Sequence, residues 1–404
     1  MALLPVGLEG VRAARSMLRG VVRVTPLVGS RALSDRVGGP VHLKCENIQR
    51  AGSFKIRGAY VRIARLSDED RAHGVVAASA GNHAQGVALA ASLLGTKAAV
   101  FMPEGAALPK IAATRSYGAE VVFQGTSVDE TLTAAGEYVA DRSAVLIHPF
   151  DHPDIVAGQG TIGLEILEQC PDVRTVLVAV GGGGLAAGIA VAVKALRPDV
   201  RVIGVQAEGA AAYPVSLKAG HPVGLPSMST MADGVAVARP GDTTFEIVSR
   251  LLDDVVTVSE ESLSRALLLC LERSKLIVEP AGAAAVAGLL DQPRAFEPPL
   301  VAVLSGGNID PVLLLRVLRH GLAAAGRYLS LRCKIPDRPG ALARLLGELA
   351  EMGVNVLDVL HERTAARLHV DEVEVFLQLE SRGPGHCEDV LTRLREKGYS
   401  LVLG

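Results

Sequence analysis

Residues that could do chemistry lie in four short segments of this 404-residue chain, each at the end of a predicted strand. The first segment contains Lys55, which lies between Phe54 and Ile56. A lysine amine that is desolvated in such an apolar setting loses its proton more readily and can act as a nucleophile. The alternative is a solvated lysine at the start of a helix capped by Ser53, because most lysines are surface groups.

The second segment, Ser79–Gly86, reads Ser-Ala-Gly-Asn-His-Ala-Gln-Gly and directly follows the predicted strand Val75–Ala78. Small residues before a helix leave free backbone N–H groups at the positive end of the helix dipole, which suits a carboxylate or a phosphate. The alternative is structural, with Asn82 as the N-cap of the helix and His83 on a half-buried face.

The third segment is a run of four glycines, Gly181 to Gly184, between the predicted strand Thr175–Val180 and a helix. Glycines let the backbone approach a phosphate closely, so this is the strongest signal for an anion site. The spacing of Gly182, Gly184 and Ala187 also fits the G-x-G-x-x-A pattern of dinucleotide-binding folds. That pattern alone does not identify the cofactor. If the protein were a nicotinamide-dependent enzyme, the other three segments would have no assigned role.

The fourth segment, Ser305–Asn308, follows the predicted strand Leu300–Leu304. A serine hydroxyl there can hydrogen-bond a ring nitrogen, although a plain glycine-rich turn is the alternative. Together the four segments supply an amine, an amide, a phosphate cradle and a hydroxyl. This is the inventory needed to hold pyridoxal phosphate, a planar ring with an aldehyde, a 3-hydroxyl, a ring nitrogen and a phosphate arm.

The elements that must position these segments are short apolar strands that alternate with Ala- and Leu-rich helices from about residue 75 onward. Such alternation predicts βαβ units and mainly parallel sheets, whose ligands bind at the carboxyl ends of the strands. The predicted strands are Val75–Ala78, Ala98–Met102, Glu120–Phe123, Ala144–Ile147, Thr175–Val180, Val200–Val205, Asp254–Val258 and Leu300–Leu304. The predicted helices include Asp129–Asp141, Leu164–Cys170, Leu263–Arg273 and Pro311–Leu322.

The pattern changes near Arg327 to a βαββαβ order, which predicts an independent α+β module of the ferredoxin-like kind. We therefore expect a catalytic domain over residues 1–326, with a smaller subdomain at about 53–150, and a second domain over 327–404. The predicted elements of the second domain are Tyr328–Ile335, Gly340–Met352, Val354–Leu360, Asp371–Leu379, Glu388–Lys397 and Tyr399–Leu403.

Composition narrows the possible partners and the compartment. A formal charge of −2 gives no electrostatic reason to expect nucleic acid or a membrane surface as a partner. Five scattered cysteines favour neither a disulfide framework nor a zinc site and fit a reducing cytoplasm. The N-terminus lacks a signal peptide pattern. The uncharged stretch Val176–Val193 approaches the length of a membrane span, but its glycines indicate a strand, a turn and a helix.

With these motifs in hand, the sequence resembles the threonine/serine dehydratase family of fold type II pyridoxal-phosphate enzymes. The resemblance covers about residues 10–320 and runs through the four segments and Ala232–Val237 in family order. It implies an α/β fold of two parallel-sheet subdomains. Residues 327–404 resemble an ACT domain, with Asp-Arg-Pro-Gly-Ala-Leu at a strand-to-helix turn.

The resemblance also implies a role for individual residues. Lys55 would be the Schiff-base and catalytic lysine, Phe54 would flank the ring and Asn82 would hydrogen-bond its 3-hydroxyl. Ser305 would contact the ring nitrogen. The phosphate would be bound by Gly181, Gly182, Gly183, Gly184 and Leu185, and Gly234 and Glu279 would lie near the ring. The substrate carboxylate would be held by Ser79, Ala80, Gly81, Asn82 and His83.

The implied activity is β-elimination and deamination of L-threonine, and of L-serine, to a 2-oxo acid and ammonia. A threo-3-hydroxyaspartate or phenylserine ammonia-lyase and a non-catalytic amino-acid sensor remain as alternatives. Related serine racemases have a second serine where this chain has Ala80, so racemisation lacks its second proton carrier. Glu208 matches one residue of their metal site, but Pro214 replaces another, and no metal is expected.

The ACT domain implies an amino-acid effector, isoleucine or valine. The expected effector site comprises the turn residues Asp337, Arg338, Pro339, Gly340, Ala341 and Leu342, together with Asn355. Backbone N–H groups of that turn would face the effector carboxylate. A purely dimerising role for the domain is the alternative, and the family resemblance suggests a homotetramer.

Overall fold

The computed structural model describes residues 4–125, 128–363 and 368–403. The chain folds into two compact units, Met1–Leu314 and Leu315–Gly404. The division falls within helix α14 (Pro311–Ala324), whereas the sequence places the domain boundary after the end of this helix.

The larger sheet of the first unit has six strands in the order β1-β2-β10-β7-β8-β9. All neighbouring strands are parallel except β1 and β2, which confirms the predicted, mainly parallel sheet. The strands are β1 (Leu27–Gly29), β2 (Val41–Lys44), β7 (Thr175–Ala179), β8 (Arg201–Ala207), β9 (Asp254–Val258) and β10 (Leu300–Val303). β1 and β2 are not among the predicted strands. β1 has only three residues, and the sequence of β2 (Val-His-Leu-Lys) is interrupted by polar residues, so neither shows an apolar run like those of the predicted strands.

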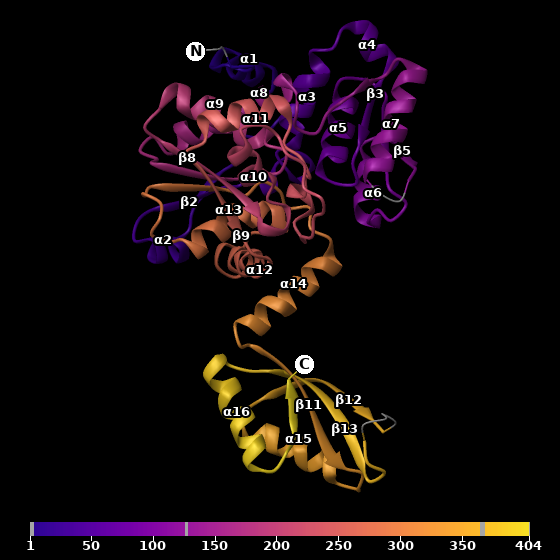
Figure 1. The fold of residues 1–404 in the computed structure, drawn as a ribbon, viewed down its shortest axis with the longest axis vertical. Helices are drawn as coiled ribbons and strands as arrows, with labels where there is room; N and C mark the ends of the chain where they lie inside the picture. Colours follow the sequence, from indigo (N-terminus) through magenta and orange to yellow (C-terminus); the bar gives the residue numbers. More distant parts are fainter. Residues whose placement is uncertain (1–3, 126–127, 364–367, 404) are drawn as a thin grey trace. The chain divides into compact units, whose positions relative to one another are not determined.

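Helices cover both faces of this sheet (Figure 1). One face carries α1 (Leu8–Met17), α8 (Pro153–Gln169), α9 (Gly184–Leu196) and α11 (Asp242–Leu251). The other carries α2 (Arg31–Val37), α12 (Glu260–Leu269) and α13 (Pro280–Asp291). The predicted helix Leu164–Cys170 is the C-terminal part of α8, which begins at Pro153 because His152 caps it there.

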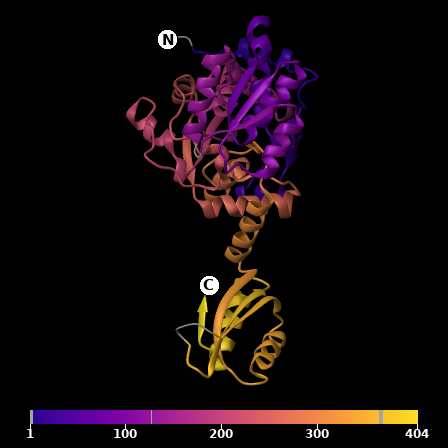
Figure 2. The ribbon, with the colours of Figure 1, turned by 90° about the vertical axis from the view of Figure 1, so that its right-hand side faces the viewer.

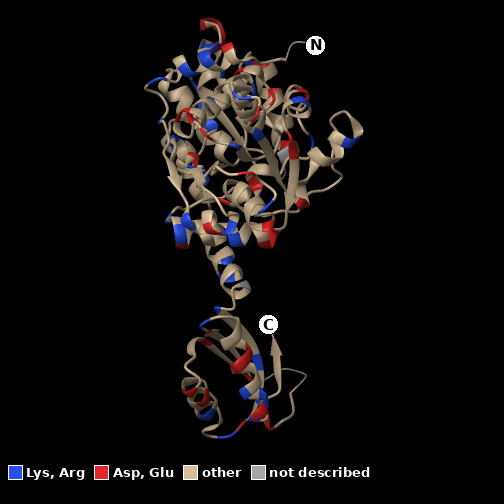
Figure 3. Cartoon of the chain, turned by 90° about the vertical axis from the view of Figure 1, so that its left-hand side faces the viewer, with Lys and Arg blue, Asp and Glu red and all other residues tan. Residues whose placement is uncertain are grey.

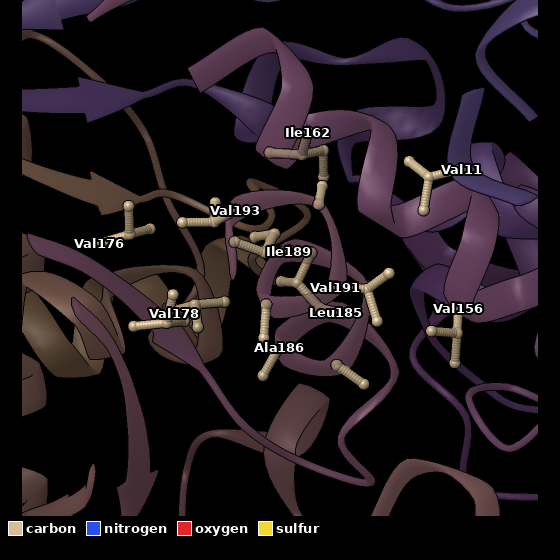
Figure 4. Close-up of a cluster of buried hydrophobic side chains, with 14 of the residues drawn as sticks. Val11, Val156, Ile162, Val176, Val178, Leu185, Ala186, Ile189, Val191 and Val193 are labelled. Atoms are coloured by element: carbon tan, nitrogen blue, oxygen red, sulfur yellow. The ribbon is translucent and has the colours of Figure 1, made fainter. Parts of the chain in front are cut away.

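Buried apolar side chains, mainly valine, isoleucine and alanine, from α1, α8, β7 and α9 form one hydrophobic core between the sheet and the helices of the α9 face (Figure 4). Residues Gly184 to Val193 of α9 are apolar on every side of the helix, which agrees with their complete burial. The stretch that approaches a membrane span in length is thus β7, a glycine turn and α9, as predicted. No helix among the described residues is long and apolar enough to cross a bilayer.

The smaller sheet has four parallel strands in the order β5-β4-β3-β6 (Figures 1 and 2). They are β3 (Val75–Ala78), β4 (Ala98–Met102), β5 (Glu120–Phe123) and β6 (Val145–Leu146), and all four were predicted. Val75 and Ala77 face one core, with α5, and Val76 and Ala78 face another, with α7. The helices of this region are α3 (Lys55–Ala64), α4 (Asp68–His73), α5 (Asn82–Leu93), α6 (Leu108–Ser116) and α7 (Val128–Arg142).

Short helical elements complete the first unit. They are η1 (Glu46–Ile48), η2 (Arg50–Gly52), η3 (Glu208–Ala210), α10 (Ala212–Ala219), η4 (Asp233–Val235) and the π-helix η5 (Cys270–Ser274). Lysine and arginine are interspersed with aspartate and glutamate on both units (Figure 3). Such mixing agrees with the nearly neutral formal charge of the chain.

The second unit contains an antiparallel sheet in the order β12-β13-β11-β14, with two helices packed on one face (Figure 2). Its elements are β11 (Tyr328–Pro336), α15 (Ala341–Glu351), β12 (Asn355–Glu362), β13 (Glu372–Glu380), α16 (Pro384–Glu396) and β14 (Leu401–Leu403). This confirms the predicted βαββαβ order. Alternate residues of β11 are buried against Leu345 and Leu394 of the helices, as the period of two requires.

A buried ion network fixes the position of α3 in the first unit. The Arg57 guanidinium binds Glu46 at 2.8 Å and Glu165 at 2.6 Å, and the Lys44 ammonium binds Glu165 at 2.6 Å. All four side chains are at most 4% exposed. Burial raises the pKa of Glu46, but Arg57, the Thr25 hydroxyl and Lys44 together outweigh burial and hold that pKa below its ordinary value. Two cations and two anions therefore balance inside the protein, and the network joins α3 to β2 and α8.

Removing Arg57 leaves two buried carboxylates short of a partner. We expect Arg57→Ala to lower the free energy of unfolding by about 3–5 kcal/mol, because a broken buried pair strands charge away from water. The matched control is Arg15→Ala, which removes an exposed pair between α1 and Glu168 of α8 and should cost about 0–1 kcal/mol. Urea unfolding of both variants measures the difference, and equal losses would contradict this assignment.

Candidate active site

Lys55 is the first residue of α3, and its ammonium donates a hydrogen bond to the Pro149 carbonyl at 2.9 Å. Burial lowers the pKa of Lys55 to about 8, and the nearby Glu279 carboxylate partly opposes this shift. The amine lies 5.2 Å from the centre of the Phe54 ring. A Cβ added to Gly86 of α5 would lie 3.1 Å from the Lys55 backbone, so glycine allows α5 to approach α3 closely.

The segment Ser79–His83 turns from β3 into α5. The Ser79 hydroxyl accepts from the Gly81 N–H at 3.1 Å, and Asn82 begins the helix. The Asn82 amide donates to Glu279 Oε1 at 2.5 Å, which joins this segment to the start of α13. His83 is buried with Nε2 2.7 Å from the Ile147 carbonyl, and burial lowers its pKa to about 3. Its neutral ring therefore donates to Ile147 and is held away from solvent.

The four glycines lead from β7 into α9, with Gly183 as the N-cap at φ +100°. No side chain caps this helix, so its first N–H groups are free for an anion. The Gly182 carbonyl accepts from the Tyr213 hydroxyl at 3.2 Å and from the Thr244 hydroxyl at 2.6 Å. A Cβ on Gly183 would lie 1.9 Å from the Tyr213 oxygen, so this position requires glycine on two grounds.

The segment Ser305–Asn308 lies directly beside the lysine segment. The Phe54 N–H donates to the Ser305 carbonyl at 3.2 Å, and the Gly307 N–H donates to the Gly52 carbonyl at 2.9 Å. The buried Ser305 hydroxyl has a long contact of 3.4 Å to the Ala281 carbonyl. It can therefore turn to another acceptor at little cost.

Glu279 and Gly234 border the same region. The Glu279 N–H donates to the Gly306 carbonyl at 3.0 Å, and burial raises the pKa of the Glu279 carboxyl, which the Asn82 hydrogen bond partly opposes. A Cβ on Gly234 would lie 3.7 Å from Glu279 Oε1. Lys55, Asn82, Glu279 and Ser305 thus meet at one place, although the sequence separates them by up to 250 residues.

The segment His148–Asp151 connects the lysine to the glycine run, although no motif in the sequence singles it out. The Pro149 carbonyl accepts from Lys55, while the Phe150 ring fills the space that a Cβ on Gly182 would need, at 2.4 Å. Asp151 accepts from the Thr244 N–H at 3.1 Å, close to the Gly182 carbonyl. The signal was present, because this segment follows the predicted strand at residues 144–147 and so lies at a carboxyl end.

In the second unit, the turn between β11 and α15 lines a cavity of about 290 Å³. All six predicted turn residues, from Asp337 to Leu342, line it. His361 and Arg363 of the β12 region also line it and were not predicted, and Arg363 forms an ion pair with Asp337 at 3.3 Å. Asn355 is not part of this lining and donates instead to Glu380 on the neighbouring strand at 3.2 Å.

The donor set fits pyridoxal phosphate. An amine of lowered pKa suits its aldehyde, an uncapped helix start suits its phosphate, and the Asn82 amide and Ser305 hydroxyl suit its ring substituents. A parallel α/β body with these groups at its strand ends defines a pyridoxal-phosphate enzyme of fold type II. The chain belongs to the family described as pyridoxal-phosphate dependent enzyme, which residues 18–306 match, and residues 329–401 match the ACT domain.

Individual relatives agree with this assignment. The chain is 46% identical to an L-threonine ammonia-lyase of Thermotoga maritima over 98% of this chain and 99% of that protein. A solved threonine deaminase, the processed form of isoform 2 from Solanum lycopersicum, is 39% identical, with a TM-score of 0.74 over 78% of this chain and 86% of its own. A maize serine racemase is 35% identical, with a TM-score of 0.74 over 79% of this chain and 99% of its own.

The lowered pKa of Lys55 predicts how fast the protein takes up its cofactor at each pH. Only the neutral amine attacks an aldehyde, so the rate should rise roughly tenfold per pH unit below about 8 and level off above it. Mixing cofactor-free protein with pyridoxal phosphate and following visible absorbance measures the rate. If the rate kept rising up to about pH 10.4, the pKa of an unperturbed lysine, burial would not have lowered the pKa of Lys55.

Proposed function

We propose that this enzyme deaminates L-threonine, and also L-serine, by β-elimination, with 2-oxobutanoate or pyruvate and ammonia as products. The observation that carries the proposal is the Lys55 amine of lowered pKa, next to Asn82, Glu279 and Ser305 in a pyridoxal-phosphate enzyme fold. The L-threonine ammonia-lyase of Thermotoga maritima, similar over nearly the whole chain, supports the choice of substrate.

Each part of the site has a proposed task. Lys55 binds the cofactor covalently, Phe54 flanks the ring, and Asn82 donates to the 3-oxygen. Ser305 faces the ring nitrogen, and Gly234 and Glu279 border the ring. The start of α9, Gly181 to Leu185, binds the phosphate through backbone N–H groups. The turn from Ser79 to His83 binds the substrate carboxylate with its backbone, because the His83 side chain is already engaged by Ile147.

When bound, pyridoxal phosphate supplies an electron sink that makes the α-proton of an amino acid acidic. The neutral Lys55 Nζ then takes this proton, which its lowered pKa favours near neutral pH. The Pro149 carbonyl, which accepts from the ammonium at 2.9 Å, can hold the protonated amine in place. Ser305 offers a hydroxyl in place of a carboxylate, so it does not keep the ring nitrogen protonated, which favours prompt loss of the β-hydroxyl.

Elimination is favoured over racemisation by a single residue. Racemisation needs a second proton carrier on the opposite face of the substrate. Ala80 stands where the related racemases have a serine, and an alanine carries no proton. The similarity to a maize serine racemase shows that the fold alone does not choose between the two reactions.

Loss of the amine should abolish the activity. We expect Lys55→Ala to turn over no threonine and to lack the visible absorbance of the bound cofactor, while unfolding at the same urea concentration as the wild type. The assay measures 2-oxobutanoate from threonine, with serine and 3-hydroxyaspartate run beside it. Wild-type rates in the variant would contradict the role of Lys55, and turnover of 3-hydroxyaspartate alone would contradict the proposed substrate.

We further propose that residues 327–404 form a regulatory domain that binds isoleucine or valine, in a homotetramer whose mass light scattering can measure. The cavity beside the Asp337–Leu342 turn supports this, because no side chain caps the start of α15 and the Arg363 guanidinium suits a carboxylate. The Ala341 N–H is already used by the Arg338 carbonyl at 3.2 Å, so the N–H groups that follow it would face the effector. Coupling to the active site requires that the effector bind one state of the enzyme more tightly than another.

The effector proposal predicts a selective loss of regulation. We expect Arg363→Ala to raise the isoleucine concentration needed for half its effect by roughly tenfold, because a hydrogen-bonded charge partner of the carboxylate is lost. Turnover without effector should stay unchanged. Arg395→Ala, at an exposed site on α16, is the control and should respond as the wild type does. An unaltered isoleucine response in Arg363→Ala would contradict this site.

A further inference from the structure

Asn308 lies where the lysine segment and the Asn82 segment meet, and none of the tasks above uses it. Its amide nitrogen donates to the Ala51 carbonyl at 2.7 Å and to Asn82 Oδ1 at 2.8 Å, with a longer contact of 3.4 Å to Gln85 Oε1. A backbone carbonyl can only accept a hydrogen bond. The NH₂ group of Asn308 must therefore face Ala51, which settles the orientation of this amide.

This orientation decides that of Asn82 in turn. Because the atom of Asn308 that points at Asn82 is a donor, the atom of Asn82 that meets it must be the acceptor Oδ1. The amide nitrogen of Asn82 is thereby turned to the other side, where it donates to Glu279 Oε1 at 2.5 Å. An NH₂ group has two hydrogens, so one remains for a second acceptor in the site.

Two glycines leave room for this chain of hydrogen bonds. A Cβ on Gly52, which has φ +69°, would lie 2.1 Å from Asn308 Oδ1. A Cβ on Gly306 would lie 2.1 Å from Glu279 Oε1 and 3.1 Å from the amide nitrogen of Asn82. A side chain at either position would therefore collide with the groups that form this chain of hydrogen bonds.

We propose that Asn308 is a positioning residue, which holds the Asn82 amide with an N–H directed at the 3-oxygen of pyridoxal phosphate. This inference rests on the proposed function, which assigns Asn82 to that oxygen. A donor there favours the ionised oxygen over the hydroxyl, whereas the amide carbonyl would favour the hydroxyl. Asn308 therefore sets the ionisation of a cofactor that it does not touch.

The test compares holoenzymes of the wild type, Asn308→Ala and Asn308→Asp. The readout is the ratio of visible to near-ultraviolet absorbance of the bound cofactor as a function of pH. We expect both variants to need a pH about one unit higher for the same ratio, roughly a tenfold change in the ionisation constant. The alanine removes the donor, and the aspartate presents acceptors to Ala51 and Asn82, so Asn82 is no longer held.

Asn47→Ala is the matched control. Buried Asn47 donates to the Ile277 carbonyl at 3.0 Å and lies against Gly307, so it supports the same loop without contacting Asn82. This variant should lose stability but keep the wild-type pH dependence. An equal spectral shift in Asn47→Ala, or no shift in either Asn308 variant, would overturn the positioning role.

A second measurement covers the case in which the Asn308 variants do not fold. A crystal structure of the wild-type holoenzyme at a resolution that shows hydrogens settles which amide atom of Asn82 faces the 3-oxygen. The nitrogen there supports the proposal, and the oxygen overturns it. Failure of this inference can be told apart from failure of the proposed function. A wild-type protein that binds no cofactor, or that leaves threonine unchanged, would contradict the proposed function itself.

Discussion

The site depends on the buried balance of charge around Arg57, two residues after Lys55. Four charged groups are expensive to bury, and such a cluster is tolerated only when each partner is well placed and fully hydrogen-bonded. Arg57 binds carboxylates from η1 and α8 at once, and Lys44 at the end of β2 completes the set. The first turn of α3, which carries the reactive amine, is thereby tied to the sheet and to its covering helix.

With α3 held in place, close backbone contacts bring the remaining segments together. Gly86 lets α5 pack against the Lys55 backbone, and the lysine segment pairs with the Ser305 segment through Phe54. Phe150 fills the space beside the glycine run while the carbonyl of Pro149 holds the Lys55 amine. These contacts leave little or no room for a side chain, so packing favours glycine at these positions, and Gly183 needs it for its backbone conformation as well.

Burial then tunes the groups that remain. It lowers the pKa of Lys55 to about 8, lowers that of His83 further and raises that of Glu279. The amine is thereby ready to exchange protons near neutral pH, while His83 stays neutral and structural. Solved structures of a threonine deaminase and of a serine racemase both resemble this chain, so the fold by itself does not determine which of the two reactions takes place. We therefore assign that choice to individual side chains, and Ala80 is the one that we propose.

The sequence by itself determined the parallel α/β body, the βαββαβ module and the four strand-end segments, because strand and helix periods and glycine runs are local patterns. It could not show that Asn308 donates a hydrogen bond to Asn82, that the Pro149 carbonyl accepts one from the Lys55 amine, or that Arg363 lines the cavity beside the Asp337–Leu342 turn. Nor could it show that the His83 ring is hydrogen-bonded to the Ile147 carbonyl. Only the tertiary structure decided these, since each joins residues far apart in the chain, and hydrogen-bond direction and burial exist only after packing.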